Sequence, residues 1–143
     1  MKYWSIIGLF AIGIMFSCGN SKEVMTDEVL AEFKLNDTTN IEIGQMMICS
    51  EDLKLFVQFD SVLTDSRCPR GANCIWEGDA AVQFSVTYKR AMDTISLHTN
   101  QEGEKVQSLF GYNFEFINLS PYPGDKDYDT ATKTAQIVVT EAD

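Results

Sequence analysis

The residues best able to do chemistry lie between positions 65 and 80, in the segment D-S-R-C-P-R-G-A-N-C-I-W-E-G-D-A. Cys68 and Cys74 flank a short turn, so we expect them to form a disulfide. Closing a loop of about seven residues stabilises a fold by about 2 kcal/mol in the chain-entropy model. The residues around this bond are the candidate binding loop, namely Asp65, Arg67, Arg70 and Trp76.

This loop has two interpretations. In the structural one, Asp65 caps backbone amides or pairs with Arg67, while Trp76 covers the sulfurs and closes one end of the core. In the other, the disulfide displays Arg67 and Arg70 as a rigid reactive loop of the kind that protease inhibitors use, since preorganisation favours binding. The structural interpretation already explains the cysteines and the tryptophan, so we favour it.

Two further groups of residues are possible metal ligands. The carboxylates of 125–129 alternate as in a calcium loop, but Thr130 and Gln136 stand where that loop needs Gly and Glu. A second set combines Met46, Met47, Cys49 and His98, which are soft ligands suited to copper(I). Neighbouring residues of a strand point to opposite faces, so at most one of the two methionines could share a metal site with Cys49. We therefore predict no metal and no other cofactor.

Enzyme signals are missing from the sequence. His98 is the only histidine, and no serine or cysteine lies in a nucleophile elbow. The sequence predicts a protein that is not an enzyme.

The N-terminus has the pattern of a secretory signal, with Lys2 followed by an apolar run from Ile6 to Phe16. The run is too short to span a bilayer, which needs roughly twenty residues. It ends in M-F-S-C-G, which resembles the bacterial lipobox, so we expect cleavage after residue 17 and a lipid anchor on Cys18. The alternative is an ordinary signal peptide with a chance cysteine. We expect attachment to the outer membrane through this lipid, on the periplasmic face or at the cell surface.

If Cys18 carries lipid, one of the three other cysteines is left over. With Cys68 and Cys74 paired, Cys49 becomes a free thiol, which we expect to be buried in a strand because unpaired cysteine is among the most buried residue types. The sequence also leaves open a bond from Cys49 to either of the other two.

Composition and patterning predict one acidic β-domain. The formal net charge is −10, which argues against nucleic acid as a partner. Residues 18–26 are polar and form the expected tether, and 27–143 the single domain. Seven short runs rich in β-branched and aromatic residues predict an all-β fold, an antiparallel β-sandwich or open barrel. The runs are 29–35, 40–49, 53–62, 80–88, 94–99, 112–119 and 135–140.

The segment 65–80 also resembles a family of small bacterial envelope lipoproteins that share a D-S-R-C-P…C-x-W-x-G motif. Family members carry a Gly-Tyr strand that ends in a Pro-rich turn, matched here by 111–123. Glu77 departs from the small residue of many relatives. The resemblance implies a β-rich fold and no activity. We therefore expect a lipid-anchored, non-catalytic binding or structural module whose partner is an envelope protein or a small ligand. The alternatives are a protease inhibitor and a copper or calcium protein.

Overall fold

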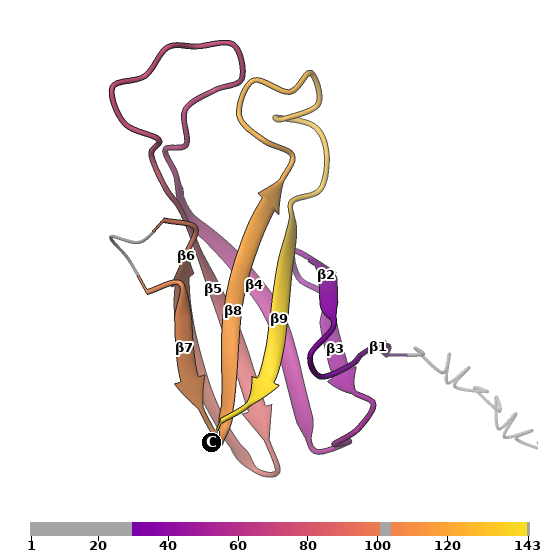
Figure 1. Ribbon diagram of the computed structural model, residues 1–143. Coiled ribbons are helices and arrows are strands. Elements are labelled where there is room, and N and C mark those ends of the chain that lie inside the picture. Colours follow the sequence, from indigo (N-terminus) through magenta and orange to yellow (C-terminus); the bar gives the residue numbers. More distant parts are fainter. Residues whose placement is uncertain (1–29, 101–103, 143) are drawn as a thin grey trace, which may run out of the picture.

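The computed structural model describes residues 30–100 and 104–142, which form two β-sheets packed face to face (Figure 1). The five-stranded sheet has the order β1 (Ala31–Phe33), β3 (Met46–Cys49), β4 (Leu55–Asp65), β5 (Ala80–Tyr88) and β6 (Ala91–His98). The four-stranded sheet has the order β2 (Thr38–Glu42), β9 (Thr134–Glu141), β8 (Tyr112–Ser120) and β7 (Val106–Leu109). The predicted all-β sandwich is confirmed. In the described part of the chain, no helix is long and apolar enough to cross a membrane.

The core lies between the two sheets because alternate side chains of each strand point to the same face. In β4 the buried side chains are Leu55, Val57 and Phe59, and in β8 they include Phe114 and Phe116. Both sheets contribute to one apolar cluster.

The structure has two more strands than the seven predicted for these residues, and one of them comes from the run 40–49. Gly44, at φ +82°, breaks that run into β2 and β3, which belong to different sheets. The other is β7, a short edge strand that pairs with β8; its sequence V-Q-S-L has no apolar alternation, which is why it is not among the predicted runs. Strand pairing also departs from the expectation at β1, which runs parallel to β3, whereas all the other pairs are antiparallel.

The two ends of the sandwich differ (Figure 1). At one end, which we call the loop end, the long segment 66–79 between β4 and β5 lies beside the segment 121–133 between β8 and β9. The two segments are joined by a hydrogen bond of 2.9 Å from Arg70 N to Pro123 O. At the other end, the turn end, short turns join β5 to β6 and β7 to β8. The predicted signal, Cys18 and the tether lie outside the described residues.

Candidate functional site

The candidate binding loop is a continuation of the β4–β5 ladder. Beyond the strands, Ser66 N donates to Asp79 O at 2.7 Å and Cys68 N donates to Glu77 O at 2.8 Å. Farther along the loop, Cys68 and Cys74 form the predicted disulfide. The loop is therefore closed both by backbone pairing and by a covalent bond.

Gly78 makes the close pairing of these segments possible. Its φ is +73°, and a Cβ placed there would lie 1.9 Å from Ser66 O and 2.8 Å from Arg67 Cα. Only a residue without a side chain fits so near another backbone. The glycine of the motif is thus explained by local geometry.

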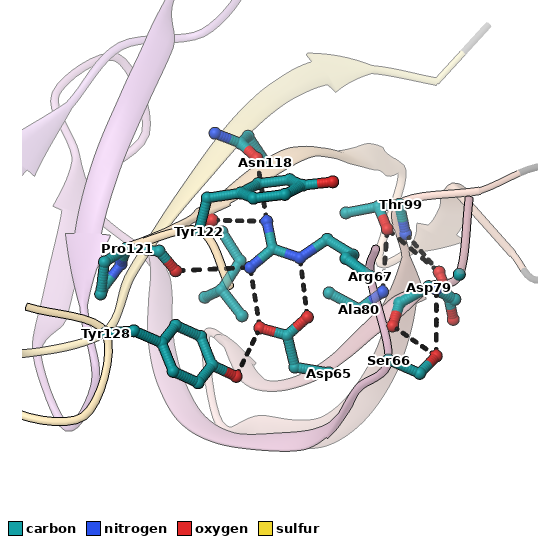
Figure 2. A network of polar contacts seen from close by, with 12 residues as sticks. Asp65, Ser66, Arg67, Asp79, Ala80, Thr99, Asn118, Pro121, Tyr122 and Tyr128 are labelled. Carbon is teal, nitrogen blue, oxygen red and sulfur yellow. Dashed lines mark hydrogen bonds and ion pairs between the residues drawn. The ribbon is translucent and has the colours of Figure 1, made fainter. Parts of the chain in front are cut away.

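Arg67 lies inside the loop end and is not displayed, contrary to the inhibitor interpretation (Figure 2). Its Nε and Nη2 donate to the two carboxylate oxygens of Asp65 at 2.7 and 2.8 Å. Its Nη1 donates to Leu119 O at 2.7 Å, and the guanidinium lies 4.4 Å from the centre of the Tyr122 ring. A buried arginine needs such partners because leaving its donors unpaired in the interior is costly.

Asp65 is the partner that neutralises this buried charge, one of the two roles expected for it. Burial by itself raises the pKa of a carboxyl, but the Arg67 guanidinium outweighs it and holds the pKa of Asp65 below its usual value. The Tyr128 hydroxyl also donates to Asp65, at 3.1 Å. Arg67 Nη2 also donates to Pro121 O at 3.4 Å, so both members of the ion pair contact the segment 121–133.

Arg70 is the exposed arginine of the loop. Its Nε lies 2.8 Å from an oxygen of Asp125, and its guanidinium lies 5.0 Å from the centre of the Tyr122 ring. Asp125 also accepts a hydrogen bond from Tyr122 N at 2.8 Å. The first carboxylate of the calcium-like run therefore holds the two loops together.

Trp76 is mostly exposed and does not close one end of the core, so this part of the structural interpretation is wrong. Its exposed fraction is 75%, and that of its neighbour Ile75 is 94%. The position beneath the loop end is filled instead by the buried residues Arg67, Leu119, Pro121 and Pro123.

An open pocket of about 550 Å³ lies beside Trp76. It is lined by Ser66, Trp76, Glu77, Gly78, Asp79 and Asn100. One oxygen of Asp79 accepts hydrogen bonds from Thr99 N at 3.0 Å and Asn100 N at 3.1 Å, and the other lies 2.6 Å from His98 Nδ1 (Asp79 and Thr99 appear in Figure 2). Burial opposes ionisation here, but these donors, His98 first, keep the pKa of Asp79 below its usual value.

The sequence does not predict the pairing of Asp79 with His98. The two residues are separated by the β5–β6 hairpin, and the only signal in the sequence is that His98 is the single histidine. β5 and β6 are neighbours, so their ends bring the pair together.

The proposed copper ligands are dispersed. Met47 and Cys49 are buried in the core, Met46 is on the other face of β3, and His98 is separated from them by β4 and β5. Across 30–100 and 104–142, no three His, Cys, Asp or Glu side chains are grouped so as to hold a metal ion. Cys49 is a free buried thiol, as expected, and burial raises its pKa.

Comparison with known proteins gives no relative for this chain. A scan against protein-family models, a search of curated proteins and a search of solved structures all found no match. The site must therefore be interpreted from its own geometry.

Proposed function

We propose that this chain is a lipid-anchored, non-catalytic binding module of the bacterial envelope, and that its binding surface is the loop end. The observation that carries the proposal is the outward position of Ile75 and Trp76, which are 94% and 75% exposed on a disulfide-closed loop. Two large apolar side chains at the tip of a fixed loop have no role in the core of this domain.

Such a tip is suited to binding for two physical reasons. Tryptophan is enriched among the residues that dominate the binding energy of protein interfaces. A loop that is already ordered loses little conformational entropy when it binds. Here the order comes from the disulfide and from the buried pair of Arg67 with Asp65.

Two alternatives have less support. A catalytic role for the Asp79–His98 pair would need a nucleophile, yet the nearby hydroxyls are engaged: Thr99 Oγ1 donates to Asp79 Oδ1 and Ser66 Oγ donates to Asp79 O, both at 3.1 Å. An inhibitor loop would have to act through Arg70, because Arg67 is buried. The Nε of Arg70 is already paired with Asp125.

The binding surface is tested by photo-cross-linking in cells. A photoreactive amino acid replaces Ile75 in one variant and Met92 in a control, because Met92 is also strongly exposed, at 71%, but lies at the turn end. We expect a discrete cross-linked species from position 75 and none from position 92. Equal cross-linking from both positions, or none from position 75, would contradict the proposal.

The anchor is tested separately by metabolic labelling with a palmitate analogue. We expect the label on the wild-type chain, its loss in Cys18→Ser, and its retention in Cys49→Ser. Label on Cys18→Ser would show that the anchor is elsewhere.

A further inference from the structure

The pocket beside Trp76 combines an aromatic residue with polar groups. Trp76 contributes the aromatic part of the lining, and Gly78 contributes backbone. Its other lining groups are polar, from Ser66, Glu77, Asp79 and Asn100. A ligand here would meet both an aromatic side chain and oxygen acceptors.

The charge of the pocket is negative. Its lining contains two carboxylates and, among the described residues, no lysine or arginine. Asp79 is partly compensated by His98 and by backbone donors. Glu77 is exposed, and its carboxylate makes no hydrogen bond or ion pair within the described part of the chain. The formal net charge of −10 adds a field of the same sign.

An aromatic wall next to an uncompensated carboxylate suits one ligand chemistry. Cations are attracted to the face of an aromatic ring, and tryptophan gives the strongest such interaction. A neutral sugar would also stack on Trp76, but it would gain nothing from the charge of Glu77. A phosphate or carboxylate ligand would be repelled.

We propose that the pocket between Trp76 and Glu77 binds an organic cation, an ammonium or guanidinium group whose carbon stem lies against the indole. The cation comes either from a lysine or arginine side chain of a partner protein or from a free small ammonium compound. This inference rests on the proposed function, because it takes the same loop end as the binding surface and names the ligand chemistry.

Fluorescence titration tests the proposal on the full chain. Trp4 and Trp76 are the only tryptophans, so in a Trp4→Phe background the fluorescence comes from Trp76 alone, whether or not residues 1–17 are cleaved. Each cationic probe is matched with a neutral one. Choline is compared with its uncharged carbon analogue, and Nα-acetyl-lysine methylamide, which keeps its side-chain ammonium group, is compared with the norleucine compound. We expect a saturable change with both cations, weakened by added salt, and none with the neutral analogues. Tighter binding of the lysine amide would indicate a protein partner, and tighter binding of choline a free ammonium ligand.

Two charge-matched variants locate the site. Glu77→Gln should weaken cation binding by about threefold, the size expected for one exposed ion pair. Glu141→Gln removes the same charge from an exposed position at the turn end and should leave the affinity unchanged. Equal effects of the two variants would overturn the proposal, since they would show attraction to net charge only.

Other outcomes also decide the matter. Equal binding of the neutral analogues, or saturable binding of a methyl glucoside that Glu77→Gln leaves unchanged, would overturn the cation proposal. Cross-linking from position 75 without cation binding would overturn this inference while the proposed function stands. Cation binding without cross-linking from position 75 would establish the pocket chemistry and contradict the proposed protein contact.

Discussion

The two ends of the sandwich place their aromatic and charged residues in opposite ways. At the turn end, Tyr88 packs inward against Phe110 and Tyr112, with ring centres 6.2 and 5.9 Å apart. At the loop end, the charged Arg67 is inside and the aromatic Trp76 is outside. The turn end is closed by apolar packing of the ordinary kind. The loop end leaves Trp76 exposed and therefore available for contact with a binding partner.

This difference has an energetic meaning. Apolar packing is non-directional, whereas a buried guanidinium is tolerated only when its donors meet acceptors in the right geometry. The carbonyl of Leu119 and both oxygens of Asp65 supply those acceptors. The loop end is therefore held in one orientation by polar contacts, and the following predictions test that distinction.

The largest effect is expected from Arg67→Met. Removing the guanidinium leaves the Asp65 carboxylate buried without its partner, and breaking a buried pair in this way costs about 4 kcal/mol. Urea unfolding measures the loss. The control is Arg70→Met, which removes an exposed pair with Asp125 and should cost less than about 1 kcal/mol. Similar losses in the two variants would show that the buried pair is not what holds the loop end.

Gly78→Ala should have the next largest effect, a loss of about 3 kcal/mol in the free energy of unfolding. The added methyl would lie 1.9 Å from Ser66 O, so the paired segments must move apart. Gly71→Ala is a matched control, because Gly71 also has a positive φ, +81°, but no atom within 4 Å of its Cβ. Its expected loss is about 1 kcal/mol, the strain of the backbone alone. Equal losses would mean that the close contact is relieved at little cost.

Removing the disulfide by Cys68→Ser together with Cys74→Ser should lower the free energy of unfolding by about 2 kcal/mol. The reason is the greater freedom of the unfolded chain once the loop is open. Thermal melting with and without a reductant checks this, since the reductant should lower the Tm of the wild type and leave that of the double variant unchanged. An unchanged Tm in the double variant would contradict the role of the disulfide in holding the loop.

At the turn end, Tyr112→Phe should destabilise the domain less than loss of the disulfide does, and in a pH-dependent way. The Tyr112 hydroxyl donates to Asp52 at 2.9 Å. Hydrogen bonds from Lys54 N and then from Tyr112 lower the pKa of Asp52 in the fold. A lowered carboxyl pKa stabilises above the unfolded value of about 3.9, and this stabilisation is lost as the pH falls through the folded pKa. The difference in the free energy of unfolding between variant and wild type, measured by urea unfolding, should therefore shrink at acid pH. A difference that does not change with pH would contradict this prediction.

The sequence predicts those features of the two ends that depend on residues close together in the chain, and it does not predict those that depend on distant residues. Cys68 and Cys74 are close in sequence, so their pairing and the β-rich fold follow from local spacing and alternation. The acceptors of Arg67 on 118–121 are more than fifty positions away, and nothing local says that β4 and β8 end side by side. The outward position of Trp76 has no local signal either, because a tryptophan beside a disulfide is by itself expected to be buried. The loop end therefore depends on contacts between segments that are distant in sequence, which local spacing does not reveal.

The smallest effect on stability is expected from Trp76→Ala, and it bears most directly on the comparison of the two ends. A side chain that is 75% exposed contributes little to the core, so the free energy of unfolding should change by less than about 0.5 kcal/mol. The same variant should remove the cross-link from position 75, because the indole is the anchor of the proposed contact. Met92→Ala, at the turn end, should leave both stability and cross-linking unchanged. A loss above about 1 kcal/mol in Trp76→Ala would mean that the indole packs against the domain after all, and the loop end would then be closed by apolar contact just as the turn end is.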